Sequence, residues 1–171
     1  MRRAMADLRV RHRARMREKD LKQINDALAA HFGLAAPPFP ASTERADAGD
    51  AFDVLLAGGR AIGIILKNQN DRPALSVRGL LANRPTRKHV TVDLGAVKFV
   101  ANGADIMAPG IVEADPSIVA GDLVWVRDEK NGQPLALGEA LVAGPAMPRG
   151  PKGKAVKSIA YVGDPLWNLE V

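Results

Sequence analysis

The sequence predicts an α+β domain over residues 1–88, followed by a mostly-β domain, a small barrel, over residues 89–171. Three observations predict this division. A chain of 171 residues, 47% hydrophobic and 25% charged, suits two small globular domains. Proline and charge gather at residues 83–88, as expected of a boundary. The first part carries 17 Lys and Arg against 9 Asp and Glu, and the second carries 7 against 10, which suggests that the first part meets a polyanion.

The first predicted element is a strand over residues 8–17. Its even positions are apolar or histidine and its odd positions are all arginine, which is the period-two alternation of a half-buried strand. We expect His12 on the apolar face and the arginines mostly together on one exposed face. These are Arg9, Arg11, Arg13, Arg15 and Arg17.

A helix is predicted next, over residues 21–32, because leucine and isoleucine recur there at helical spacing. Asp20 is a fair N-cap and Gly33 a good C-terminal stop. Residues 35–50 are rich in Ala, Pro, Ser, Asp and Gly and are predicted to be a loop.

A β-hairpin follows, because two apolar runs flank Gly58-Gly59, a pair typical of two-residue turns. Residues 74–81 fit a third strand or a short helix, and their pattern favours neither.

The second domain shows several short strands at close spacing, which indicates a small barrel. A short helix is predicted over residues 95–102, ended by Gly103, and Asn131-Gly132 is a strong hairpin turn. The predicted strands cover residues 90–92, 107–113, 122–127, 134–143 and 159–162, with a closing segment at 166–169.

No catalytic or metal-binding pattern is present. The chain has no cysteine, its three histidines are far apart, and Gly-x-Ser-x-Gly and P-loop motifs are absent. The close carboxylates Asp47, Asp50 and Asp53 fit a solvated loop leading into a strand. We therefore expect no enzyme activity, no metal and no cofactor. Apolar runs fall short of the ~20 residues of a membrane span, and no signal peptide is recognisable, so we expect a cytoplasmic protein.

Positive charge gathers in two places. Arginine binds phosphate oxygens bidentately, so the arginine-rich strand favours RNA, although a charged edge strand that resists aggregation is the alternative. The second place is a Gly- and Pro-rich loop with no acid in it, suited either to a phosphate backbone or to solubility alone. Its cations are Arg149, Lys152, Lys154 and Lys157. Trp125 and Trp167 are expected in the core, which leaves no aromatic platform for stacking bases.

The run from Val92 to Ile111 reads Asp-x-Gly-Ala-x-Lys-Phe-Val and then Gly-Ala-x-Ile-Met-x-Pro-Gly. It resembles the signature of PUA domains, named for pseudouridine synthase and archaeosine transglycosylase. The similarity is to archaeal PUA proteins related to the malignant T-cell-amplified sequence family, with a pre-PUA domain before the PUA domain. Gly163-Asp-Pro-Leu-Trp167 resembles the closing strand of that group.

The resemblance implies a PUA pseudo-barrel that binds structured RNA through its first helix and the following strand. Val97, Phe99 and Ile106 are interpreted as barrel core. Carried over residue by residue, the RNA surface is Gly95, Ala96, Lys98, Gly103, Met107, Pro109 and Gly110.

The family also implies a translation factor that contacts tRNA or ribosomal RNA, on the small ribosomal subunit and beside a partner like density-regulated protein. Two alternatives stay open. In the first, the chain is the non-catalytic RNA-binding subunit of an RNA-modification system of the pseudouridine synthase or transglycosylase type. In the second, it is a protein-interaction module.

Overall fold

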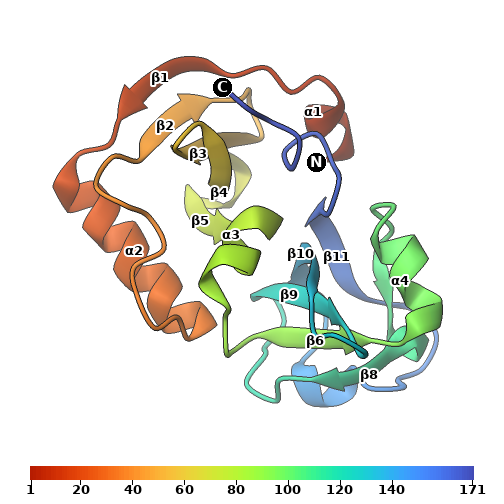
Figure 1. Ribbon diagram of the computed structural model, residues 1–171. Coiled ribbons are helices and arrows are strands. Elements are labelled where there is room, and N and C mark those ends of the chain that lie inside the picture. Colours follow the sequence, from red (N-terminus) through yellow and green to blue (C-terminus); the bar gives the residue numbers. More distant parts are fainter. The chain divides into compact units, whose positions relative to one another are not determined.

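The computed structural model describes residues 1–171, which form two compact units. Unit 1 comprises residues 1–84 and 164–171, and unit 2 comprises residues 85–163. Both units combine helices with strands, as the sequence predicts (Figure 1). No helix is long and apolar enough to cross a membrane.

Unit 1 is built on a five-stranded antiparallel sheet in which each strand pairs with the next along the chain. The central strands are almost entirely buried, and their hairpin turns at Gly58-Gly59, as predicted. The strands are β1 (Arg11–Arg15), β2 (Glu44–Asp47), β3 (Phe52–Ala57), β4 (Arg60–Leu66) and β5 (Arg72–Leu75). The prediction of a loop over residues 35–50 is wrong for β2. Only Ala46 of this strand is buried, so its sequence carries no apolar alternation.

The helices of unit 1 are α1 (Arg2–Ala6), α2 (Glu18–Phe32), α3 (Val77–Asn83) and the 3₁₀ turn η1 (Lys67–Gln69). Helix α2 begins three residues before the predicted start, so Asp20 lies inside its first turn and is not the N-cap. It ends at Gly33, whose left-handed φ of 64° suits glycine, as predicted. Residues 74–81 contain both the strand and the helix that the sequence left open, because β5 ends at Leu75 and α3 begins after Ser76. The Ser76 Oγ caps α3 by accepting a hydrogen bond from the Gly79 N–H.

Residues 164–171 belong to unit 1, whereas the sequence placed them in the second domain. The Arg78 guanidinium lies 4.3 Å from the centre of the Trp167 ring, and its Nε donates to the Trp167 carbonyl at 2.7 Å. Trp167 was expected in the core, and this prediction is wrong, because the side chain is only half-buried and lies beside a cation. Further along, Glu170 forms a bridge with Arg60, so this segment adds to the edge of a hairpin.

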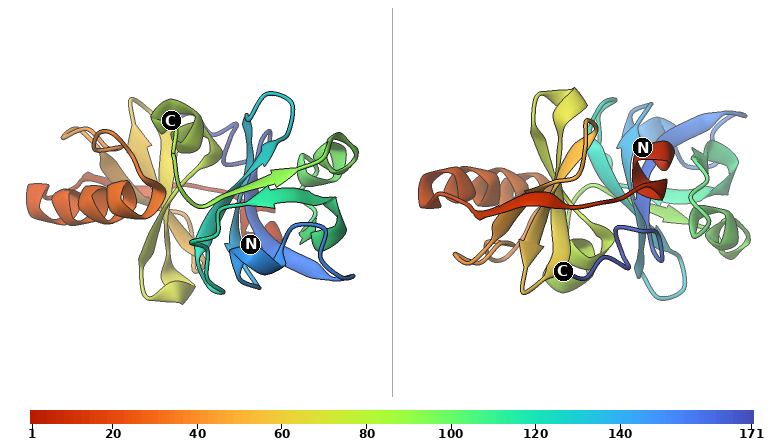
Figure 2. Two further views of the ribbon diagram at one scale, coloured as in Figure 1. Left: turned by 90° about the horizontal axis from the view of Figure 1, so that it is seen from below. Right: turned by 90° about the horizontal axis from the view of Figure 1, so that it is seen from above.

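Unit 2 is a six-stranded sheet in the order β7-β11-β10-β9-β6-β8. Figure 2 shows its strands, coloured green to blue, from two further directions. The β6–β9 pair is parallel and all other pairs are antiparallel. The strands are β6 (His89–Val92), β7 (Ile106–Met107), β8 (Ile111–Ala114), β9 (Leu123–Asp128), β10 (Pro134–Ala140) and β11 (Lys154–Tyr161). The short helices are α4 (Leu94–Val100), η2 (Ala108–Gly110) and η3 (Gly144–Ala146).

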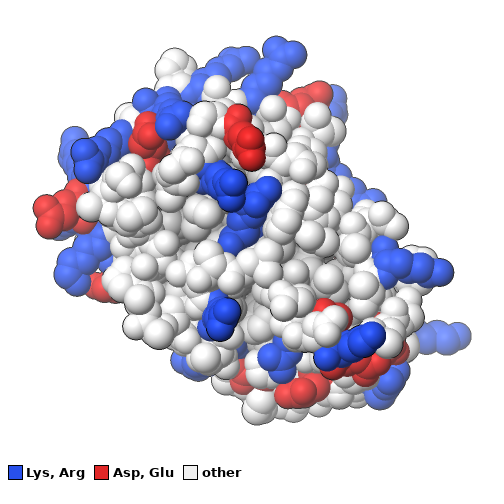
Figure 3. Space-filling view, viewed as in Figure 1, with Lys and Arg blue, Asp and Glu red and all other residues white.

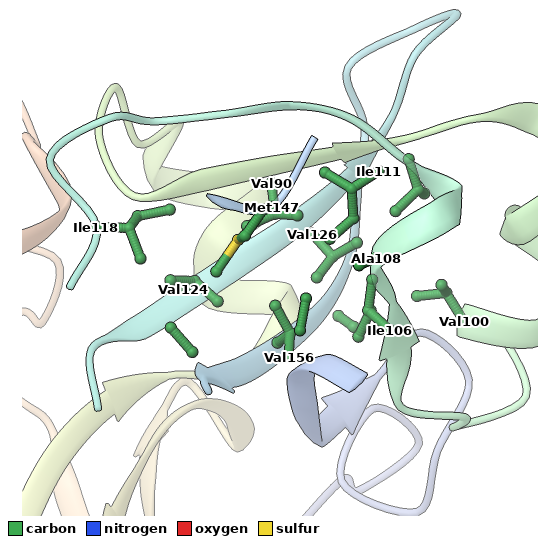
Figure 4. Packing of buried hydrophobic residues seen from close by; sticks show 14 residues of the cluster. Val90, Val100, Ile106, Ala108, Ile111, Ile118, Val124, Val126, Met147 and Val156 are labelled. Carbon is green, nitrogen blue, oxygen red and sulfur yellow. The ribbon is translucent and has the colours of Figure 1, made fainter. Parts of the chain in front are cut away.

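An apolar core lies between the strands of unit 2 (Figure 4). Val90, Val126 and Val156 come from three different strands, and each side chain is fully buried. Trp125 is also buried, as predicted, with its indole N–H donating to the Arg87 carbonyl at 2.8 Å. Burying these side chains contributes roughly 1.5–3 kcal/mol each, which fixes the sheet that carries the surface helix α4.

A buried carboxylate closes the core of unit 2 at one end. The Asp115 carboxylate accepts hydrogen bonds from the backbone N–H of Lys88 at 2.6 Å and of Ser117 at 2.9 Å. The Lys88 ammonium is itself buried and contacts Asp122 at 2.9 Å. Burial acts to raise the pKa of Asp115, but the N–H donors outweigh it and hold this pKa below its usual value.

Removing residues 164–171 is expected to destabilise unit 1. The lost cation–π contact and hydrogen bond together contribute about 1–3 kcal/mol. Hydrogen exchange checks this. Amides of β4 and α3 should exchange faster in the truncated chain, while amides of β9 keep their rates. Equal acceleration in both units would contradict the assignment of this segment.

Asp115 is expected to make the stability of unit 2 depend on acid pH. Because its pKa is lowered on folding, its contribution is complete above about 3.9, the usual aspartate value, and disappears as the pH falls through the lower folded pKa. Asp115→Asn should lower the free energy of unfolding at pH 7 by about 1–3 kcal/mol. Denaturation curves between pH 2 and 7 should also show a flatter pH dependence for this variant. An unchanged pH profile would contradict the assignment.

Candidate nucleic-acid interface

Asp93 organises the surface on which the PUA-like signature lies. Its Oδ1 accepts from the Ala96 N–H at 3.0 Å and so caps α4, while its Oδ2 forms an ion pair with Arg149 Nη1 at 3.0 Å. The same Arg149 nitrogen donates to the Pro109 carbonyl at 2.9 Å. One arginine thereby joins the start of α4, the 3₁₀ turn η2 and the loop before β11.

Three large apolar side chains around this junction face solvent. Leu94, Phe99 and Met107 are 56%, 58% and 46% exposed. The Lys98 ammonium lies 5.1 Å from the centre of the Phe99 ring. Large exposed apolar side chains are typical of interaction sites, which makes these residues a candidate interface. We call these residues, with Lys98, the α4 surface.

The interpretation of Phe99 as core is wrong, because α4 has only seven residues and buries Val100 alone. Val97 is partly buried against the core, and Ile106 is buried, as predicted. The interpretation as core rested on hydrophobicity, which does not distinguish the exposed Phe99 from Val97 and Ile106. The sequence also did not predict that Leu94 is exposed.

The glycines of the signature have different roles. Gly95 is exposed, and a Cβ added to it would meet only the Asp93 carboxylate, at 3.4 Å. Another molecule therefore has room to approach the backbone of Gly95. Gly103 instead has a φ of +85° and lies against the Tyr161 ring, at 2.6 Å from an ideal Cβ, so the fold itself requires it. Gly110 lies close to Ala96, and Pro109 is exposed on η2.

The basic segment 149–157 differs from the predicted mobile loop. Lys154 and Lys157 belong to strand β11. Two of the four cations have carboxylate partners from distant positions, because Arg149 contacts Asp93 and Lys154 contacts Asp105 at 2.9 Å. Lys152 forms no ion pair and is exposed. The sequence did not predict these two ion pairs, because neither Asp93 nor Asp105 lies within residues 149–157.

The arginines near the N-terminus are all exposed, and Arg11–Arg15 form strand β1, which is shorter than the strand predicted over residues 8–17. Figure 3 shows Lys and Arg side chains at the upper edge of the molecule, where Figure 1 draws β1. The prediction of one arginine face is wrong. The register with β2 shifts between Arg11 and Ala14, and His12 has a φ of 49°. This one-residue bulge reverses the alternation, so Arg11 aligns with Asp47 and Arg15 aligns with Glu44, on opposite faces of the sheet. His12 is correspondingly exposed and does not lie on an apolar face.

Arg13 is neutralised within the protein. Its guanidinium binds Glu44 bidentately, through Nε at 2.7 Å and Nη2 at 2.8 Å. This hydrogen bonding raises the pKa of Arg13 and lowers the pKa of Glu44. Arg9, Arg11 and Arg17 form no ion pair, so they retain charge that an external phosphate can meet.

Residues 88–162 match the family model of the PUA domain, which identifies unit 2 as a PUA domain. The chain is 37% identical over 165 residues to an uncharacterized protein of Methanocaldococcus jannaschii, covering 95% of this chain and 99% of that protein. A solved hypothetical protein of Pyrococcus horikoshii is 35% identical with a TM-score of 0.78, covering 91% of this chain and 98% of that one.

Translation machinery-associated protein 20 of Saccharomyces cerevisiae is 38% identical over 88 residues, which is 48% of this chain and 49% of the yeast protein. The match thus spans about half the length of this relative. Together these similarities show that the chain belongs to the archaeal PUA-domain proteins related to the malignant T-cell-amplified sequence proteins.

The ion pairs predict that the arginines of β1 contribute unequally to RNA binding. Arg11→Ala should reduce the slope of log affinity against log salt by about 0.7–0.9, the effect of one phosphate contact. The double variant Arg13→Ala, Glu44→Ala keeps the net charge and should leave the slope unchanged. Titrations of tRNA at several salt concentrations check this. Equal slopes in all three proteins would show that Arg11 contacts no phosphate.

Proposed function

We propose that this protein is a translation-associated factor that contacts structured RNA, either tRNA or ribosomal RNA. The observation that carries the proposal is the α4 surface, where a PUA domain exposes an aromatic ring beside a cation and next to an open backbone at Gly95. The name of the yeast relative supports an association with translation.

The α4 surface suits RNA for physical reasons. A solvent-exposed phenylalanine offers a face on which an unpaired base stacks, a contact worth about 1–3 kcal/mol. Lys98 supplies charge beside this ring, and Lys152 has no carboxylate partner to neutralise it. Arg149 has a different role, because its ion pair with Asp93 commits it to holding the surface together. Met107, Pro109, Lys154 and Lys157 complete the proposed contact area on exposed positions.

The arginines of β1 form a second proposed contact area, in unit 1. Arg9, Arg11, Arg15 and Arg17 are the contributing residues, and Arg13 is reassigned to the ion pair with Glu44. In this proposal the small ribosomal subunit is the place of action, with a density-regulated-like protein as partner. The resemblance of the sequence to its family supports both.

Phe99→Ala tests the proposal. Because the ring is 58% exposed, its loss should change the free energy of unfolding little. It should nevertheless weaken tRNA or ribosomal RNA binding by about 1–3 kcal/mol, the value of one stacked base. Val119→Ala is the matched control, since Val119 is equally exposed, at 59%, on the same unit but outside the α4 surface.

Fluorescence anisotropy with labelled tRNA and with small-subunit RNA measures both variants. Parent-like affinity of Phe99→Ala for both RNAs, with the control also unchanged, would contradict a role of the α4 surface in RNA binding. Recovery of RNA-modification enzymes instead of ribosomal proteins in a pull-down would contradict the translation assignment.

A further inference from the structure

Unit 1 contains a cavity of about 500 Å³ that the PUA surface does not explain. It lies between β1 and the first two turns of α2, and its volume falls in the range of small-molecule sites. The lining residues are His12, Ala14, Arg15, Met16, Arg17, Asp20, Gln23, Ile24, Arg45, Asp47 and Asp53.

The carboxylates at the base of this cavity are already neutralised. Asp53, interpreted from the sequence as part of a solvated region, is buried in β3 and contacts Arg45 at 2.6 Å and Lys67 at 2.7 Å. Lys67 also binds Asp47 at 2.7 Å, which raises the pKa of Lys67 and lowers that of Asp47. Arg45, Asp47 and Asp53 line the cavity, and Lys67 contacts both aspartates from outside the lining, so these four charges cancel.

The charges left at the rim favour an anion. Arg15 and Arg17 line the cavity and form no ion pair, although the charge of Arg15 also acts on Glu44, which Arg13 already neutralises; the remaining acid of the lining is Asp20. Two cations against one anion leave a single net positive charge. A phosphodiester of a nucleic acid carries one negative charge, which matches this excess.

The opposite wall suits a base. The apolar face of α2 consists of Leu21, Ile24, Leu28 and Phe32, of which all but Ile24 are buried. Ile24 instead lines the cavity together with Met16 and the Gln23 amide. An apolar surface bordered by one amide binds the face of a heterocycle and leaves a donor and an acceptor for its edge.

The backbone of His12 adopts a conformation that is unfavourable for a residue with a side chain. Its φ of 49° lies in the left-handed region, and its side chain is exposed at the bulge between Arg11 and Ala14. Bulges of this kind often redirect a side chain beside a binding site. Here the bulge places His12 at the rim of the cavity.

We propose that this cavity binds one nucleotide of a single-stranded RNA segment. The base lies against Met16, Ile24 and Gln23, and the phosphodiester lies between Arg15 and Arg17. His12 closes the rim above it. The inference rests on the proposed RNA-binding function and adds to it a site in unit 1 that takes an unpaired nucleotide.

Calorimetric titration of the full chain with the single-stranded hexanucleotides A6, C6 and U6 tests the site. Arg17→Gln and Ile24→Ser should each weaken binding of the preferred hexanucleotide about fivefold or more. Lys19→Gln is the matched control. Lys19 lies in the first turn of α2, two residues after Arg17, but does not line the cavity, so this variant also loses one cation and should bind like the parent. Parent-like binding by Arg17→Gln and Ile24→Ser would overturn the proposal.

Two further comparisons sharpen the test. His12→Gly should raise the Tm by a few degrees, because glycine adopts this φ without strain, and yet weaken hexanucleotide binding, whereas His12→Ala should weaken binding without raising the Tm. Nucleoside 5′-monophosphates and inorganic phosphate should bind at least tenfold more weakly than the hexanucleotide. Equal or tighter binding of either would overturn the assignment to an RNA strand.

Failure of this inference is distinguishable from failure of the proposed function. A parent chain that binds neither tRNA, ribosomal RNA nor hexanucleotides would overturn both. A parent chain whose tRNA or ribosomal RNA binding falls with Phe99→Ala, but which ignores hexanucleotides, would overturn the cavity site alone.

Discussion

The Asp93 carboxylate is the constraint on which the α4 surface of unit 2 depends. One oxygen caps α4 and the other holds Arg149, so a single side chain fixes a helix start and a distant loop at once. α4 is too short to be stable by itself, since isolated helices need roughly 12–15 residues. The cap at Asp93 and the packing of Val100 therefore stabilise α4. The helix in turn holds the apolar side chains of Phe99 and Leu94 in contact with solvent.

Unit 1 uses buried charge in a related way. Asp53 lies within the sheet on β3, and it is paired with Arg45 from the neighbouring strand β2 and with Lys67 from the 3₁₀ turn η1. Removing one partner of such a network leaves an uncompensated buried charge, which costs about 3–5 kcal/mol. The floor of the cavity is consequently rigid, while the arginines at its rim keep their freedom to reach an external anion.

Much of the fold followed from local patterns. The hairpin at Gly58-Gly59, the stop of α2 at Gly33 and the short strands of unit 2 are all set by residues close together in sequence. The bulge at His12 was not predictable in this way, because it depends on the pairing of β1 with β2, a strand without apolar alternation. The partners of Arg149 and Lys154 likewise lie far away, at Asp93 and Asp105.

The return of residues 164–171 to unit 1 has a consequence for how the chain folds during synthesis. Unit 2 is an insertion within unit 1, since the last segment of unit 1 follows all of unit 2 in sequence. Domains generally fold as they leave the ribosome. Unit 1 therefore cannot form the contacts of Trp167 with α3 and of Glu170 with β4 until all of unit 2 has been synthesised. Unit 1 is thus the first unit to begin during synthesis and the last to have its whole sequence available for folding.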